Sequence, residues 1–202
     1  MAVAVATFDP LHQAVLETLK AAEALITEYP RGGKLLFLLL AGVSATLTFF
    51  SSTALVPIGV YVWGPTTTLL LLWLGGTLGG TLGYWLARTL GRRAVIRLLP
   101  GARLHRYETF FGTRARWRSI LLFRIALQSE LPSYVLGLVR YPFPRYLLII
   151  LLAELPYVLV VVYLGEAFLE RNVLVFAAVF ALGIGLTVWA WRSLQQEMRH
   201  EA

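Results

Sequence analysis

Residues 35 to 87 contain no Asp, Glu, Lys or Arg, so the fold must keep a long apolar stretch away from water. A transmembrane helix takes about 20 consecutive, mostly apolar residues, and this stretch is too long for one crossing. Residues 35–50 and 66–88 each have roughly the length of a single crossing helix. Residues 51–65 between them are apolar but interrupted by proline and glycine, which predicts a partly inserted, re-entrant segment.

The composition also indicates one helical membrane domain. Hydrophobic residues make up 58% of the 202 residues and charged residues 14%, and the mean hydropathy of +0.70 excludes an ordinary soluble domain. The net charge of +7 lies mostly beside apolar segments, where it indicates membrane topology rather than nucleic-acid binding. Cysteine is absent, the three histidines lie in separate regions, and no nucleophile or nucleotide-binding motif occurs. We therefore expect no metal, no cofactor and no enzymatic activity.

A second apolar stretch, residues 119–137, carries Arg124, Gln128 and Glu130 near its middle. An ionised side chain at the centre of a bilayer costs at least about 2.5 to 3.5 kcal/mol, so such residues usually face a partner or a water-filled cavity. Arg124 and Glu130 are six residues apart, which is not the spacing of an ion pair on one helix. The proline two residues after Glu130 predicts a kink or a break. We predict that residues 119–144 form a second re-entrant segment that lines a site.

The triplet Glu-Leu-Pro occurs twice, beginning at Glu130 and at Glu154, and the second copy lies within a third apolar stretch. Each copy joins an acid to a proline that frees a backbone carbonyl. The residues predicted to bind or transport a substrate are Arg124, Gln128, Glu130 and Glu154. The residues predicted to break the hairpins are Pro57, Gly64, Pro65, Pro132, Gly137 and Pro156.

Two roles are open for Arg124. Its planar guanidinium fits phosphate oxygens, which favours headgroup binding. A buried ion pair or a carbonyl clamp that holds the segment together would use the same residue. The two acids are likewise open to structural pairing with Arg124 or to a part in transport, including a proton-linked switch.

Five glycines recur at helical spacing in the stretch before residue 88, and small residues at this spacing let a second helix approach closely. We interpret them as helix-packing residues; they are Gly75, Gly76, Gly79, Gly80 and Gly83. Residues 10–29, within an N-terminal segment of residues 1–33, have the pattern of an amphipathic helix with an acidic polar face. Docking on the protein's own spans or on a second subunit is open, and so is a homodimer.

Arginines are concentrated between residues 88 and 118, which the positive-inside rule places in the cytoplasm. If residues 119–144 enter the membrane and return, the later arginines except Arg171 fall on the same side. This topology predicts a membrane domain over residues 34–168, followed at residues 169–202 by a last transmembrane helix and a tail. Both termini are then cytoplasmic, and we expect a multi-pass protein of the plasma membrane, in bacteria the inner membrane.

The block Gly-Gly-Thr-Leu-Gly-Tyr-Trp-Leu-Ala-Arg-Thr-Leu-Gly at residues 79–91 resembles the DedA superfamily, also called the VTT or SNARE-associated Golgi domain. Spaced residues up to a Tyr-Leu-Gly triplet at 163–165 extend the resemblance over roughly residues 35–168, and it is greatest to the TVP38/TMEM-like branch. The other matching residues are Arg124, Pro132, Gly137 and Pro156.

The resemblance implies an all-α polytopic membrane protein with two re-entrant helical hairpins that face each other, each followed by transmembrane helices. It also implies movement of phospholipids or polyprenyl-phosphate lipids between leaflets, in some members driven by the proton gradient. The family's hairpin arginine corresponds to Arg124. The chain differs from the family pattern in having no acid in residues 35–107, and in having Ala126 and Leu127 where a proline is usual.

Two functions follow as expectations. A lipid transporter or scramblase predicts a polar crevice in which Arg124 can be reached by a phosphate headgroup. A membrane scaffold or envelope-homeostasis factor predicts the same residues fully paired and dry. The expected partners are membrane lipids with phosphate headgroups.

Overall fold

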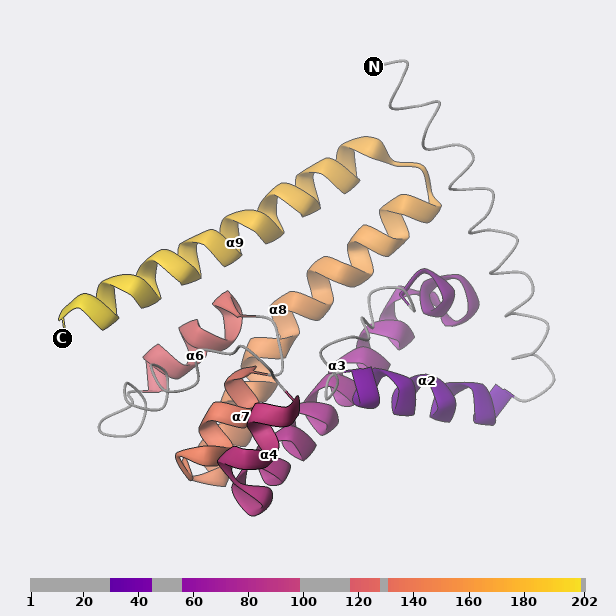
Figure 1. Cartoon of the computed structure of the whole chain (residues 1–202). Coiled ribbons are helices and arrows are strands. Elements are labelled where there is room, and N and C mark those ends of the chain that lie inside the picture. Colours follow the sequence, from indigo (N-terminus) through magenta and orange to yellow (C-terminus); the bar gives the residue numbers. More distant parts are fainter. Residues whose placement is uncertain (1–29, 45–55, 99–116, 128–130, 201–202) are drawn as a thin grey trace.

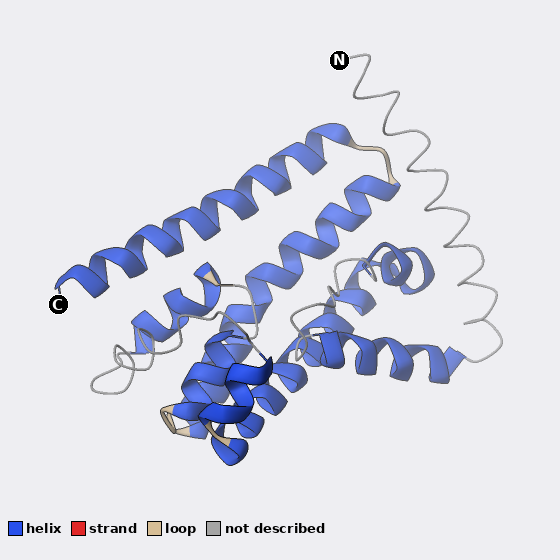
Figure 2. Ribbon diagram, viewed as in Figure 1, coloured by secondary structure: helices blue, strands red, loops and turns tan. Residues whose placement is uncertain are grey.

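The computed structural model describes residues 30–44, 56–98, 117–127 and 131–200, and in these residues every regular element is a helix (Figures 1 and 2). The helices are α2 (Pro30–Ser44), α3 (Val56–Leu90), α4 (Arg92–Leu98), α6 (Trp117–Ala126), α7 (Leu131–Leu138), α8 (Phe143–Leu169) and α9 (Val173–His200). The predicted all-α class is confirmed for this part of the chain. The predicted amphipathic helix at residues 10–29 and the centre of the Arg-rich segment lie outside it.

Three of these helices are long and apolar enough to cross a membrane: Val56–Leu90, Phe143–Leu169 and Val173–Glu197. They contain the predicted crossings near residues 66–88 and in the last third of the chain. The predicted crossing at residues 35–50 is described only up to residue 44. The protein is therefore a helical membrane protein by the length and composition of its helices.

The chain folds back on itself at Gly64, within α3. Gly64 has φ 76° and ψ 168°, which only glycine adopts readily, and Pro65 begins the second part of the helix. In one straight helix, nine residues span about 13.5 Å. A Cβ placed on Gly59 would nevertheless lie 2.7 Å from the side chain of Thr68. The two parts of α3 thus lie side by side, at the break predicted for Gly64 and Pro65, whereas Pro57 lies in the first turn and breaks nothing.

The long part of α3 and α8 form an antiparallel pair at the centre of the fold. Tyr84 near the end of α3 stacks on Tyr146 near the start of α8, with ring centroids 4.5 Å apart. Four residues earlier in α3, Gly80 packs against Ile150, four residues later in α8. Figure 1 shows the two helices running alongside each other, with α9 next to α8 on the outer side.

Helix α7 packs against α3 with almost no side chain between the two backbones. A Cβ on Gly137 would collide with the backbone carbonyl of Tyr84 and lie 2.9 Å from Ala87. Gly137 lies inside α7 and does not break this helix. Its missing side chain allows α7 to approach α3 closely. Pro132 is the second residue of the same helix, a position that proline tolerates.

The described residues of α6 and of α7 are in each case too few to cross a membrane alone. The two helices contain 10 and 8 residues, or about 15 and about 12 Å, against a hydrocarbon core of about 30 Å. Helix α6 packs between α8 and the C-terminal half of α9, in a buried cluster that includes Phe123, Ile150 and Leu194. The end of α6 therefore lies at the middle of the long helices.

Candidate functional site

Arg124 and Glu154 form an ion pair in the interior of the helix bundle. Arg124 Nη2 lies 2.7 Å from Glu154 Oε1, and the two side chains are only 8% and 16% exposed. Arg124 comes from the last turn of α6 and Glu154 from the middle of α8. Two of the four predicted site residues are therefore in direct contact, whereas Gln128 and Glu130 lie outside the described residues.

Two hydroxyl groups extend this pair into a hydrogen-bond network. Arg124 Nη1 donates to Ser133 Oγ at 2.7 Å. The Tyr146 hydroxyl lies 3.0 Å from the same oxygen and 2.7 Å from the carbonyl of Gly80, to which it donates. Because a hydroxyl has one proton and two lone pairs, Ser133 can accept from Arg124 and donate to Tyr146. We call Arg124, Ser133, Tyr146 and Glu154 the arginine network.

The sequence prediction did not include Ser133 or Tyr146. Tyr146 and Glu154 are eight residues apart on one helix and thus share a face. That spacing could have identified Tyr146 as a neighbour of the acid. Ser133 has no such signal, because its contacts are with residues of other helices.

Glycines of α3 make room for the charged groups. A Cβ on Gly76 would lie 3.2 Å from Glu154 Oε2, and one on Gly80 would lie 3.0 Å from Arg124 Nη2. Gly75 faces α2 instead, where a Cβ would be 2.7 Å from Ala41, and Gly83 makes ordinary contacts with α7. These glycines thus contact four helices, α2, α6, α7 and α8, and two of them line the arginine network.

Helix α8 continues through Pro156, where the sequence predicted a break. A proline inside a membrane helix is tolerated when neighbouring helices bond the backbone groups that it disturbs. The carbonyl that Pro156 leaves without its helical donor is that of Leu152. The indole Nε1 of Trp73 in α3 donates to the adjacent carbonyl, that of Leu151, at 2.9 Å. Glu154 is therefore held on a continuous helix.

One nitrogen of the Arg124 guanidinium has no hydrogen-bond partner among the described residues. This nitrogen, Nε, is buried. Leaving a buried donor unpaired costs about 1–3 kcal/mol. The site therefore has a charged donor to offer to one further acceptor.

A layer of aromatic side chains connects the network to the arginine-rich end of α3. Tyr84 stacks on Tyr146, and its hydroxyl donates to the carbonyl of Tyr141 and accepts from Arg88. The Arg88 guanidinium also lies over the ring of Trp85, 5.6 Å from its centroid. The end of α3 and the turn between α7 and α8 thus meet at one end of the bundle.

In the described ranges, no three His, Asp or Glu side chains are grouped as metal ligands would be. A search of curated proteins and one of solved structures found no match. The model of the VTT domain matches residues 50–167, which is more than half of the chain. The match contains all four residues of the arginine network and ends before α9. It is a match to the family as a whole, so the TVP38/TMEM-like branch stays a prediction. The chain belongs to the VTT-domain family, the family of DedA and SNARE-associated Golgi proteins.

Proposed function

We propose that this protein moves phospholipids or polyprenyl-phosphate lipids between membrane leaflets, as a transporter or scramblase, with the arginine network as the headgroup site. The observation that carries this proposal is Arg124, a buried arginine in a membrane domain with a donor that no described residue bonds. Proteins of the VTT family are generally membrane proteins proposed to act as transporters or scramblases.

The geometry supports exchange between a carboxylate and a phosphate. Glu154 accepts from one terminal nitrogen of Arg124, while no residue in the described part of the chain bonds Nε. A phosphate oxygen can bond Nε while a second displaces the carboxylate, because phosphate fits two donors of the guanidinium fork at once. Displacement would leave Glu154 without its counter-ion in an apolar region. Proton-linked transport stays part of the proposal.

The proposed topology has α6 and α7 as a re-entrant hairpin. Each has too few described residues to cross alone, and α7 ends near Tyr141 at the same end of the bundle as Arg88. Arg93, Arg140 and Arg145 are exposed at or beside this end. The positive-inside rule places it in the cytoplasm. The fold-back at Gly64 would be part of the opposing hairpin, with both chain termini cytoplasmic and the plasma membrane as the location.

A non-transporting scaffold or envelope-homeostasis factor is the second candidate. The observation that favours it is the closed pair, since Arg124 is only 7% exposed and already bonds Ser133 and Glu154. In that function the network would only hold α6, α7 and α8 together. The two functions predict different results in a transport assay.

The test is reconstitution into liposomes that contain a fluorescent phosphatidylglycerol, with an impermeant quencher added outside. Wild type should expose inner-leaflet lipid to the quencher, and Arg124→Gln should lose this activity. Arg93→Gln is the matched control, because Arg93 is exposed and lies in α4, which contributes no residue to the network. Retained activity in Arg124→Gln would contradict the headgroup site. No activity in wild type with phosphatidylglycerol, phosphatidylethanolamine and a polyprenyl phosphate would favour the scaffold.

A further inference from the structure

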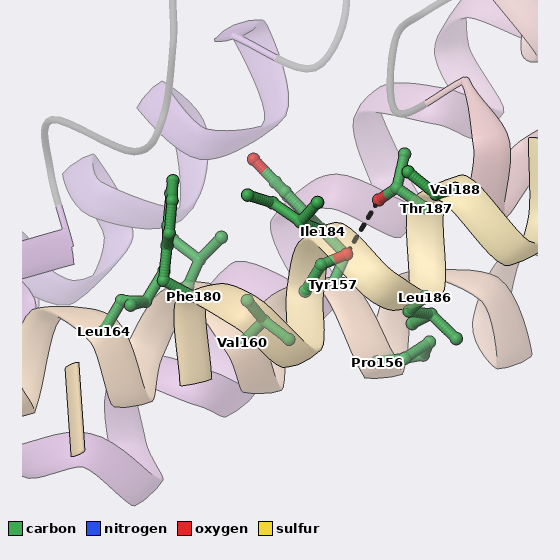
Figure 3. Close-up of a pocket in the computed structure, with 11 residues that line it drawn as sticks. Pro156, Tyr157, Val160, Leu164, Phe180, Ile184, Leu186, Thr187 and Val188 are labelled. Carbon is green, nitrogen blue, oxygen red and sulfur yellow. Dashed lines mark hydrogen bonds between the residues drawn. The ribbon is translucent and has the colours of Figure 1, made fainter. Parts of the chain in front are cut away.

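A cleft of about 290 Å³ lies between α8 and α9 and begins at Pro156, two residues beyond Glu154 along α8 (Figure 3). Its walls include Val160 and Leu164 from α8 and Phe180 and Ile184 from α9. Figure 3 shows these side chains on both sides of the space between the two helices. The cleft is distinct from the arginine network, and none of the four network residues lines it.

The end of α6 accounts for the position of the cleft. Leu186 of α9 lines the cleft and also packs against the buried cluster that contains Phe123 of α6. Helix α6 thus fills the space beside α8 and α9 on one side of Leu186 and ends at Ala126. On the other side the same two helices leave an open groove.

The lining of the cleft is mostly hydrocarbon, with Tyr157 and Thr187 as its polar side chains. No charged side chain contributes to it, and the Thr187 hydroxyl is already bonded to the carbonyl of Gly183 in its own helix at 3.0 Å. The cleft has the volume of about ten water molecules, and water in an apolar cavity lacks the two to four polar partners that it needs. An apolar occupant is therefore strongly favoured over water.

The surroundings identify the class of that occupant. Both walls belong to helices of membrane-crossing length and composition. Beyond the cleft, α9 exposes large apolar side chains such as Leu174 at 84% and Leu182 at 66%. Such a surface is stable only in the hydrocarbon of a bilayer. The molecules that reach the cleft from the side are therefore lipid chains.

We propose that the cleft between α8 and α9 binds the acyl or prenyl chain of a lipid whose phosphate headgroup reaches the arginine network. Pro156 at one end of the cleft is two residues from Glu154, so the chain site and the headgroup site occupy adjacent levels of α8. The binding of the headgroup rests on the proposed function. The binding of the lipid chain requires α9, which lies outside residues 50–167, the part of the protein that matches the VTT domain.

The test uses a phosphatidylglycerol with a photoreactive diazirine in the middle of one acyl chain, in nanodiscs of phosphatidylglycerol and phosphatidylcholine. Adducts are mapped by mass spectrometry of the whole protein after digestion. We expect adducts at residues 156–164 and 180–188 in excess of those at the lipid-exposed start of α9. In Val160→Phe they should fall roughly five-fold or more, because the phenyl ring occupies apolar surface that the chain would bury. Leu174→Phe, at an exposed position, is the control and should leave them unchanged.

The other results overturn the proposal. Equal labelling of the cleft and of the exposed face of α9 would mean ordinary bilayer contact only. Cleft adducts that persist unchanged in Val160→Phe would place the chain elsewhere. A dimer that Val160→Phe dissociates, with no lipid adduct in wild type, would assign the cleft to a second copy of the chain.

Arg124→Gln separates the chain site from the headgroup site. Reduced cleft labelling together with lost lipid movement in a folded Arg124→Gln variant supports both sites on one lipid. Unchanged lipid movement in Arg124→Gln, with cleft labelling that still depends on Val160, would remove the headgroup site and leave the chain site standing. Unchanged cleft labelling together with lost lipid movement would overturn the assignment of the two sites to one lipid.

Discussion

Removing one charge of the Arg124–Glu154 pair should destabilise the protein more than removing both. The side chains are 8% and 16% exposed, so either partner left alone is a buried, uncompensated charge. Breaking a buried pair from one side costs about 3–5 kcal/mol. We take about 3 kcal/mol for Arg124→Met and for Glu154→Leu, because the acid retains some exposure. That is roughly a hundred-fold change in the ratio of folded to unfolded protein.

The double variant Arg124→Met with Glu154→Leu should have a free energy of unfolding within about 1 kcal/mol of the wild-type value, because well-packed apolar residues replace buried ion pairs at little or no cost. Ser133 and Tyr146 keep their mutual hydrogen bond in this variant, so no new buried hydroxyl is orphaned. The two single costs would add to about 6 kcal/mol if the sites were independent. The predicted double variant therefore departs from additivity by about 5 kcal/mol, whereas separate sites depart by about 0.5 kcal/mol.

The measurement is reversible unfolding of the purified variants in mixed micelles, followed by circular dichroism as the fraction of denaturing detergent rises. If the double variant lost the sum of the two single losses in free energy of unfolding, the reasoning would be refuted. The two charges would then not interact measurably. The same three variants also serve the transport assay. A stable double variant that moves no lipid would assign the charges to function, whereas one that moves lipid like wild type would assign them to structure alone.

Three further predictions use the same unfolding measurement. Gly137→Ala should cost about 1–3 kcal/mol, because the methyl group meets a backbone carbonyl of α3; Gly83→Ala, with ordinary contacts only, should be nearly neutral, and equal effects would contradict the close approach. Gly64→Ala should cost about 1–3 kcal/mol for its backbone conformation alone. Its control is Gly185→Ala, in open space within α9, which should stabilise by about 0.5–1 kcal/mol. Trp73→Phe should cost about 1 kcal/mol for the lost indole hydrogen bond, and an unchanged midpoint would show that this bond contributes nothing.

The sequence predicted those parts of the fold that have a local cause. Gly64 and Pro65 predict a reversal of the chain, because glycine adopts a positive φ readily and proline is favoured at the start of a helix. The charges of Arg124 and Glu154 are conspicuous, because few side chains are so costly at membrane depth. Both residues belong to the network that the structure describes.

The contacts between distant segments were not predictable in the same way. Pro156 predicts a break by its local chemistry, yet α8 is continuous. The indole of Trp73, which bonds the carbonyl of Leu151 in this helix, is 78 residues away from Leu151 in the sequence. The glycines of α3 predict that some helix packs closely, and only the fold reveals that Gly76 and Gly80 face charged side chains. Partner identity is a property of tertiary packing, which no pattern within one helix contains.

Stability alone does not explain why a charged pair occupies the centre of this membrane domain. An apolar pair of similar size would hold α6 against α8 at least as well, since the desolvation of two ions offsets most of their attraction. Two explanations remain for the pair: it fixes one arrangement of α6, α7 and α8, or it holds a charge for a substrate.

Two features favour a substrate. One donor of Arg124 is left without a described partner, and an apolar cleft begins at Pro156, two residues beyond Glu154 in α8. A purely structural pair needs neither an unused donor nor a neighbouring groove. A lipid, with an anionic phosphate and a hydrocarbon chain, uses both.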